Sequence, residues 1–304
     1  MTKKFSLDAA VAARIAALEE ENFKLRSGLG VPLTVKVEVR RVGYKARSRP
    51  REHIGRRHLV IPDCQVHDGV DTSHLPCVGR YMVEKQPDVV VCIGDFADMP
   101  SLCSYDRGKK QFEGRRYRTD VEAAVRAMAQ LMAPLQEYNE AQRRAGKKPY
   151  RPRLVMTLGN HEHRIARAVE EDARLDGTIS VADLQYEKFG WEVHPFLEVV
   201  EIDGVEYAHY FTTGAMGRPV TSAAALLRER AGSAVMGHVQ HTDVAIHRKT
   251  QKVALFVGTC YLHDEAFLTP QGQGQRRQIV MLNEVEGGHF DPMFVSLRYL
   301  AKYA

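Results

Sequence analysis

The sequence predicts an α/β fold, because short apolar runs rich in Val, Ile and Leu alternate with helical stretches along most of its length. The first strands are predicted at 59–61, 89–93 and 154–156. Later strand-like runs are at 205–211, 242–248, 252–258 and 278–285, and helices are predicted at 120–139, 162–175 and 221–231. With 304 residues, of which 44% are hydrophobic, the chain can bury one large core and carry an appendage.

Each of the first three strands is followed directly by a polar cluster. The clusters are Asp63-Cys64-Gln65, Gly94-Asp95-Phe96-Ala97-Asp98 and Gly159-Asn160-His161-Glu162, and a lone His209 and Gly237-His238-Val239-Gln240 come later. In α/β folds the carboxyl ends of neighbouring strands share one edge of the sheet, where ligands bind. Because Asp, Asn and His are metal-ligating side chains, their convergence at this edge predicts a metal site.

The order of these clusters resembles the calcineurin-like metallophosphoesterase superfamily. The pattern of that superfamily is D-x-H, G-D-x-x-D, G-N-H-[DE], a later His and G-H-x-H, and the resemblance extends from Asp63 to Gln240. It implies a four-layer α/β/β/α sandwich with two metal ions at the strand ends. The implied activity is the hydrolysis of phosphomonoesters or phosphodiesters.

Two residues depart from the superfamily pattern. Gln65 and Gln240 stand where the family has histidines, and in the family both histidines bind the first of the two metals. The ligands of the second metal are all present, so we interpret the departures as a remodelled first site beside an intact second one. His67 and His241, close to the vacated positions, are alternative ligands.

The resemblance implies a ligand set for two divalent ions. Asp95 would bridge the two metals, Asn160, His209 and His238 would complete the second site, and Asp63 with the amide oxygens of Gln65 and Gln240 would form a weaker first site. Carboxylate and amide oxygens favour Mn²⁺ or Mg²⁺ over Zn²⁺. We therefore expect Mn²⁺, with Mg²⁺, Zn²⁺ or Ni²⁺ as alternatives.

The resemblance also implies catalytic roles. His161 matches the family histidine that contacts the phosphoryl or leaving-group oxygen, which makes it a general acid or a transition-state stabiliser. Asp98 matches the carboxylate that pairs with this histidine and favours its protonated form.

Arg164 lies where the Ser/Thr phosphatase branch has a phosphate-binding arginine, a task that suits a guanidinium group. The alternative is a solvated charge on the same helix as Arg167. The Asp-Arg-Gly extension of those phosphatases is replaced here by Met99-Pro100, which disfavours a protein phosphatase.

The wider pattern resembles a phage and prophage group of the superfamily. That group has D-x-Q together with G-H-x-Q, a Tyr-Leu-His-Asp-Glu run like that at 261–265, and an end like that at 291–297. The resemblance makes the pair of glutamines a trait of the group. The resemblance to this group does not indicate which substrate the protein acts on.

Three regions are predicted: an N-terminal helix at 1–30, a basic strand or linker arm at 31–57, and the phosphoesterase domain at 58–304. In the helix, Val11, Leu18 and Leu25 recur every seven residues, with Ile15 and Asn22 between them. This pattern is typical of a short parallel zipper, which would make a homodimer. An amphipathic helix packed on its own domain explains the same pattern.

Positive charge is concentrated in the second region. The segment from Lys36 to Arg57 has nine Lys or Arg against two Glu, a net charge of +7, whereas the whole chain is only +5. Such a cluster could bind a nucleic-acid backbone, and the alternative is a solvated basic linker. The loop at 101–117 is also basic, and it follows the Gly-Asp-Phe-Ala-Asp cluster closely enough to overhang the metals.

Composition agrees with a cytoplasmic enzyme, and the resemblance to the phage and prophage group implies a bacterial or phage-infected cell. No apolar run approaches the 18 residues of a membrane span, and Arg14 and the Glu19-Glu20-Glu21 run interrupt the Ala-rich N-terminus, unlike a secretory signal. The five cysteines form no C-x-x-C pair and are odd in number, which argues against a disulfide framework.

The sequence thus predicts a metal-dependent phosphoric ester hydrolase. The favoured substrate is DNA or RNA, cleaved as a phosphodiester, because the basic segments supply contacts to a phosphate backbone. One alternative is a phosphomonoesterase acting on nucleotides or nucleic-acid ends. Another is a nucleic-acid-binding protein whose degenerate metal site does not turn over.

Overall fold

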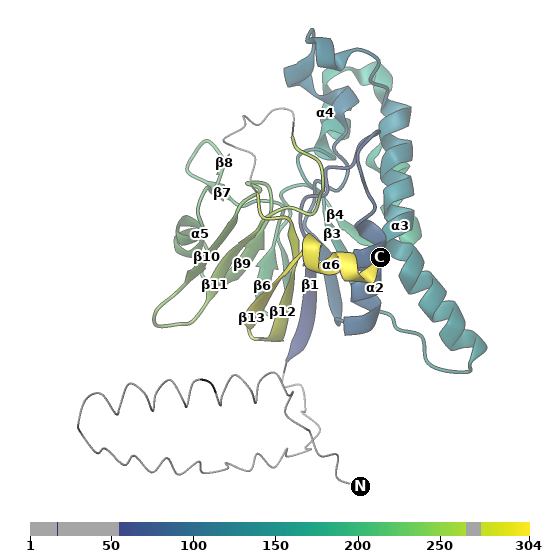
Figure 1. The fold of residues 1–304 in the computed structure, drawn as a ribbon. Coiled ribbons are helices and arrows are strands. Elements are labelled where there is room, and N and C mark those ends of the chain that lie inside the picture. The colour runs from purple at the N-terminus through teal and green to yellow at the C-terminus, as the bar shows by residue number, and fades with distance from the viewer. Residues whose placement is uncertain (1–16, 18–54, 266–274) are drawn as a thin grey trace, which may run out of the picture. The chain divides into compact units, whose positions relative to one another are not determined.

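The computed structural model describes residues 55–265 and 275–304, together with Ala17 (Figure 1). The chain divides into the units Met1–Arg51 and Glu52–Ala304. The predicted N-terminal helix and most of the basic arm lie outside the described residues. Ala17 is helical and exposed.

The larger sheet has six strands. In spatial order they are β13 (His289–Ser296), β12 (Gln278–Glu286), β1 (Arg56–Ile61), β2 (Val89–Cys92), β3 (Arg153–Thr157) and β4 (Glu192–His194). The strands β1 to β4 run parallel to one another, whereas β12 is antiparallel to both β1 and β13. The parallel strands bring the segments that follow β1, β2 and β3 to the same edge of the sheet.

The second sheet has five strands. Their order is β10 (Thr242–Ile246), β11 (Val253–Val257), β9 (Ser233–Met236), β6 (Val205–Tyr207) and β5 (Val200–Ile202). The three central strands are parallel, and the two edge strands are antiparallel to their neighbours. A small third sheet pairs β7 (Thr212–Thr213) with β8 (Arg218–Pro219).

Helices cover the outer faces of the two main sheets (Figure 1). The α-helices are α2 (Leu75–Lys85), α3 (Tyr117–Arg144), α4 (His163–Glu171), α5 (Ala223–Glu229) and α6 (Leu297–Leu300). The 3₁₀ turns are η1 (Pro100–Leu102), η2 (Ser104–Asp106), η3 (Lys110–Phe112), η4 (Ala173–Leu175), η5 (Val181–Leu184), η6 (Tyr186–Phe189) and η7 (Ala301–Tyr303).

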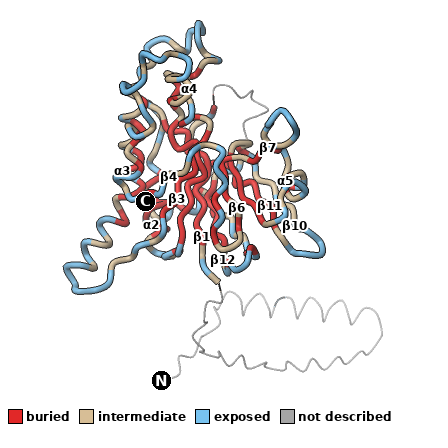
Figure 2. The backbone as a smooth tube through the Cα atoms, turned by 180° about the vertical axis from the view of Figure 1, so that it is seen from behind, coloured by how far each residue is buried: buried red, intermediate tan, exposed pale blue. Residues whose placement is uncertain are grey.

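The alternation of side chains along each buried strand divides the core. On β2, Val90 packs in the cluster that contains α2 and α3, whereas Val91 packs between the two sheets. On β11, Phe256 packs with α5, whereas Leu255 faces the larger sheet. Figure 2 shows these strands as the buried centre of the molecule. The prediction of an α/β fold is confirmed.

The elements of the larger sheet and its covering layer that were not predicted include α2 and β13. The helix α2 needs glycine at position 79 for its close approach to α3, because a Cβ there would overlap the carbonyl oxygen of Leu131. A glycine inside a helix weakens the helical pattern of the sequence. The strand β13 contains Pro292, which lacks an N–H to donate. It is tolerated because β13 lies at the edge of the sheet.

The last two arginines of the basic segment belong to the first strand. Arg56 forms an ion pair with Asp203 at 3.2 Å, and the Arg57 side chain donates to the carbonyl of Gln86 at 3.0 Å. These contacts tie both side chains to the domain. Within the described residues, no helix combines the length and hydrophobicity needed to cross a membrane.

Candidate metal centre

Residues that follow the central strands of the two sheets meet at one place. Asp63, Asp95 and Asn160 come after β1, β2 and β3, while His209 and His238 come after β6 and β9. In each sheet these strands are parallel, so their carboxyl ends share an edge.

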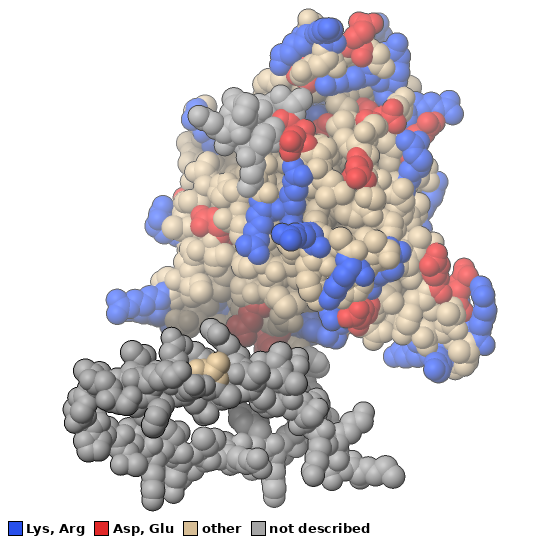
Figure 3. Space-filling model, in the orientation of Figure 1, with Lys and Arg blue, Asp and Glu red and all other residues tan. Residues whose placement is uncertain are grey.

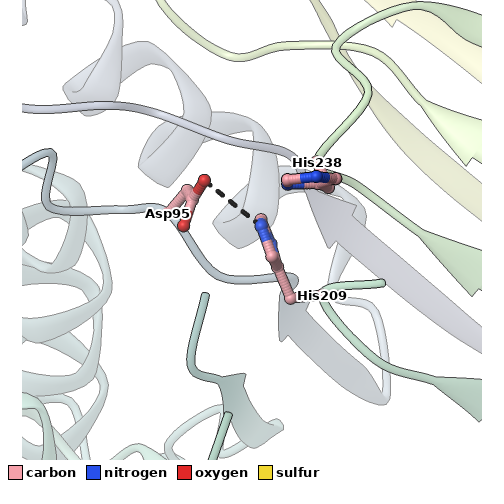
Figure 4. Close-up of side chains that lie close together, drawn as sticks. All are labelled: Asp95, His209 and His238. Atoms are coloured by element: carbon pink, nitrogen blue, oxygen red, sulfur yellow. Dashed lines mark ion pairs between the residues drawn. The ribbon is translucent and has the colours of Figure 1, made fainter. Parts of the chain in front are cut away.

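Asp95, His209 and His238 form a group that could hold a metal ion (Figure 4). One ligand atom from each lies within 4.8 Å of the others, and His209 Nε2 is 3.2 Å from Asp95 Oδ2 and 2.9 Å from Asn160 Oδ1. In the neutral tautomer whose Nδ1–H donates a hydrogen bond to the carbonyl of Ile93 at 2.9 Å, the lone pair of His209 Nε2 faces these oxygens. The four polar side chains therefore offer ligand atoms to one point.

The charges in this group change one another's pKa values. Burial opposes the charged form of His209, but the negative charge of Asp95 outweighs it and raises the pKa of His209 to about 9. Burial likewise opposes ionisation of Asp95, yet His161 and His209 lower its pKa below the usual range. Burial and the His209 charge lower the pKa of His238 to about 4.

We expect cation binding at this group to release about one proton at pH 7, because the neutral His209 ring is the ligand and its pKa is about 9. The apparent affinity for Mn²⁺ should rise with pH and level off above about pH 9. Calorimetry in buffers with different ionisation enthalpies measures the released proton. A binding enthalpy that is the same in all buffers would contradict this assignment.

Two of the predicted first-site ligands, Asp63 and Gln65, have buried polar atoms without hydrogen-bond partners in the described part of the chain. Asp63 Oδ2 and both amide atoms of Gln65 form no hydrogen bond with any described residue, although these residues are no more than 1% exposed. Buried polar atoms without partners are costly, so these oxygens fit a hard cation. Burial raises the pKa of Asp63 to about 7, so a cation beside it would favour the carboxylate. Gln240 differs, because its amide oxygen accepts the Tyr261 hydroxyl at 3.2 Å.

Four of the predicted ligands have a strained backbone. Gln65, Asp95, His238 and Gln240 have φ values of 43°, 50°, 65° and 60°. Residues other than glycine adopt this left-handed region rarely and at a cost. The fold therefore maintains an unfavourable backbone at the residues that direct side chains to the centre.

The alternative ligands lie elsewhere. His67 Nδ1 hydrogen-bonds the carbonyl of Asp68 at 2.8 Å, and its ring packs edge-on against His263. His241 is exposed, with its ring near Phe256. Neither histidine joins the metal-binding group that the described residues form.

His161, Asp98 and Arg164 form a connected cluster beside the metal-binding group. His161 Nδ1 is 2.6 Å from Asp98 Oδ1, and its Nε2 is 3.6 Å from Asp95 Oδ2. Burial alone would lower the pKa of His161, but Asp95 and Asp98 raise it. Arg164 contacts Asp98 at 2.7 Å and His161 Nε2 at 3.2 Å, so it is part of the cluster and not a solvated charge.

Glu162 has a role that the motif did not reveal. Its buried carboxylate accepts hydrogen bonds from the backbone N–H groups of Asp95, Ala97 and Gly159, each at 2.9 Å, and from the Tyr186 hydroxyl at 3.2 Å. It therefore joins the segment that carries Asp95 to the segment that carries Asn160. The G-N-H-E pattern contained the signal, but the acceptor role depends on contacts far apart in sequence.

Two motif glycines make room for the ligand carboxylates. A Cβ on Gly159 would overlap Oδ1 of Asp95, and one on Gly237 would overlap Oδ1 of Asp63. Gly94 has a φ of 91°, and a Cβ there would lie 2.6 Å from the backbone nitrogen of Gly159. These glycines are required by close approach at the centre.

We expect Gly159→Ala to weaken Mn²⁺ binding by at least about tenfold and to destabilise the fold by about 1–3 kcal/mol, because the new methyl group displaces Asp95. Gly232→Ala is the matched control, since the nearest atom is 4.0 Å from its added Cβ. Calorimetry with Mn²⁺ and thermal unfolding test both variants. Equal Mn²⁺ affinities in the two variants would show that Asp95 is not a ligand.

A cavity of about 770 Å³ opens beside the centre. Its walls include Asn160 and the His161, Asp98 and Arg164 cluster. They also include His263 and Glu265, whose Nε2 and Oε1 atoms are 3.0 Å apart. Two imidazole–carboxylate pairs therefore face one cavity. The sequence had left the position of the 261–265 run open.

Three of the five Lys and Arg side chains in the loop predicted to be basic are paired with carboxylates. Lys109 and Arg115 both pair with Asp106, at 3.0 and 2.9 Å, and Arg107 pairs with Glu171 at 3.2 Å. The cavity lining contains seven Asp or Glu against four Lys or Arg. On the face shown in Figure 3, positive and negative side chains are likewise interspersed. The cavity itself is therefore not a strongly positive channel.

Comparisons with known proteins give little further information. No protein-family model matches the sequence, and no curated protein matches it. Among solved structures, the chain is similar to a conserved uncharacterized protein from Streptococcus pneumoniae TIGR4, described as a predicted phosphoesterase. The two are 12% identical with a TM-score of 0.29, and the match covers 79% of this chain and 97% of the other. A TM-score of this size carries no argument, so the function is inferred from the site itself.

Proposed function

We propose that this protein is a divalent-metal-dependent phosphoesterase of the calcineurin-like type, with the four-layer α/β/β/α arrangement of that superfamily. The observation that carries the proposal is the convergence of Asp95, Asn160, His209 and His238 on one point, beside the unpartnered oxygens of Asp63 and Gln65. Gln65 and Gln240 match the D-x-Q and G-H-x-Q motifs of the phage and prophage group that the sequence resembles.

Two neighbouring cation sites fit these side chains. Asp95, Asn160, His209 and His238 would hold one ion, and Asp63 with Gln65 would hold the other, with Asp95 shared between them. Divalent cations would neutralise charge on the phosphoryl oxygens and lower the pKa of the attacking water. The oxygen-rich first site favours Mn²⁺.

The residues on the cavity side of the centre act on the substrate. His161, whose ring Asp98 orients at 2.6 Å, would give a proton to the leaving-group oxygen or stabilise its charge. Arg164 would bind a phosphoryl oxygen through the guanidinium that now contacts Asp98 and His161. Glu162 keeps the ligand segments in place and does not touch the substrate.

The favoured substrate is a phosphodiester of DNA or RNA. Support comes from the sequence, because the segment from Lys36 to Arg57 has a net charge of +7. A cytoplasmic enzyme that dimerises through its N-terminal helix would present two such segments to one polymer.

The second candidate is a phosphomonoesterase for nucleotides or nucleic-acid ends. The cavity of about 770 Å³, with more acidic than basic residues in its wall, favours a compact substrate over a continuous strand. A nucleic-acid-binding protein without turnover is the remaining alternative, because the first site lacks the two histidines of the family.

Three substrates distinguish these candidates: single-stranded DNA, RNA and p-nitrophenyl phosphate, each tested with Mn²⁺ over a series of salt concentrations. Polymer cleavage that falls steeply with salt supports the nuclease. Turnover of the monoester without affinity for the polymers supports the phosphomonoesterase. Polymer binding without turnover of any substrate would contradict the proposed enzyme.

A further inference from the structure

Tyr210 lies directly beside the candidate metal ligands. It follows His209 in the chain, and its ring centroid is 4.6 Å from that of His238 and 5.9 Å from that of His209. Neither the motifs nor the proposed mechanism gives this residue a role. The contacts with two ligand rings confine the phenol to the edge of the metal centre.

A second aromatic residue holds the Tyr210 ring from another direction. Phe196, in the segment between β4 and β5, packs edge-on against Tyr210 with the ring centroids 5.4 Å apart. Phe196 is itself stacked on His163, the first residue of α4, at 4.8 Å. The position of the phenol is thus fixed by aromatic contacts from separate segments of the fold.

The hydroxyl group of Tyr210 forms no hydrogen bond with any described residue, and it is not among their buried unpartnered atoms. Other tyrosines near the centre differ. The hydroxyl of Tyr186 donates to Glu162, and that of Tyr261 donates to Gln240. Tyr210 is half-buried. The aromatic contacts hold its ring in place, while its O–H is accessible to a ligand.

We propose that Tyr210 is a further substrate-contacting residue, whose O–H donates a hydrogen bond to a non-bridging oxygen of the phosphoryl group. This inference rests on the proposed phosphoesterase function. The ionised carboxylates of Asp63 and Asp95 can only accept hydrogen bonds, so they cannot bind phosphoryl oxygens directly. A neutral phenol supplies a donor, and its bond strengthens as negative charge builds on those oxygens.

Tyr210→Phe tests the role, because it removes the O–H and keeps the ring contacts. In the Mn²⁺-loaded full-length chain, we expect kcat/KM for p-nitrophenyl esters to fall about 10- to 100-fold. The Kd for inorganic phosphate, measured by calorimetry, should rise about fivefold or more. Mn²⁺ affinity and the thermal midpoint should not change. Tyr150→Phe is the control, since that hydroxyl donates to the carbonyl of Pro87 outside the centre.

The outcomes separate this inference from the proposed function. An active wild type with a Tyr210→Phe variant that matches it in rate and phosphate affinity would overturn the inference alone. Weaker Mn²⁺ binding in the variant would also overturn it, because Tyr210 would then support the ligands. A wild type without metal-dependent turnover would refute the proposed function. In that case the Kd for inorganic phosphate would decide whether Tyr210 binds the anion. Equal Kd values for the wild type and Tyr210→Phe would refute the contact, and a higher Kd in the variant would support it.

Discussion

Replacing Asp95 by asparagine is expected to lower kcat/KM by at least about 10³-fold while the fold is retained. Asp95 Oδ2 is 3.2 Å from His209 Nε2, and Oδ1 accepts the backbone N–H of His161 at 2.9 Å. Asparagine has the same shape but lacks the charge that both proposed cation sites share. Steady-state rates with bis-p-nitrophenyl phosphate and Mn²⁺ measure the loss.

Asp172→Asn is the matched control for this change. It also converts a carboxylate to an amide, but on an exposed turn where Asp172 pairs with Arg174. We expect this variant to keep the wild-type rate. An Asp95→Asn protein with near-wild-type kcat/KM would show that the shared carboxylate is not needed, and the assigned mechanism would be wrong.

His161→Ala is expected to lower kcat by about 10²- to 10⁴-fold with little effect on Mn²⁺ affinity. The ring lies between Asp98 and Arg164 on the cavity wall, where it contacts the substrate in the proposed mechanism. The loss should be smaller for esters with a good leaving group, because these need less help from an acid. Comparison of p-nitrophenyl and phenyl esters measures this dependence.

His247→Ala is the control for the histidine change, since His247 is an exposed residue in the turn between β10 and β11. It should keep the wild-type kcat for both esters. Equal losses for the two leaving groups in His161→Ala would argue against general-acid catalysis and favour charge stabilisation. Wild-type rates in His161→Ala would exclude both roles.

The positions of Asp63, Asp95 and Asn160 could be predicted because their signal is local. Each follows a short run of apolar residues that favours a buried strand, and parallel strands bring their ends together. The α/β class follows from the same runs. His209 and His238 come from the second sheet, and their place at the centre was implied by the order of the motifs.

Other features depend on contacts between residues far apart in sequence. Two of the four hydrogen bonds that Glu162 accepts come from Asp95 and Ala97, more than 60 residues away, which no local pattern reveals. Lys109 and Arg115 suggested a phosphate-binding loop, but both pair with Asp106. Charge counting along the sequence does not show which cations are already paired.

The most direct test of the metal centre is the rate of bis-p-nitrophenyl phosphate hydrolysis as Mn²⁺ is added to metal-free protein. We expect no turnover without the ion, saturable activation as it is added, and loss of the activity with a chelator. The Asp95→Asn variant should stay inactive at every Mn²⁺ concentration. Hydrolysis that is independent of metal, or none with Mn²⁺, Mg²⁺, Zn²⁺ or Ni²⁺, would contradict a phosphoesterase centred on Asp95, His209 and His238.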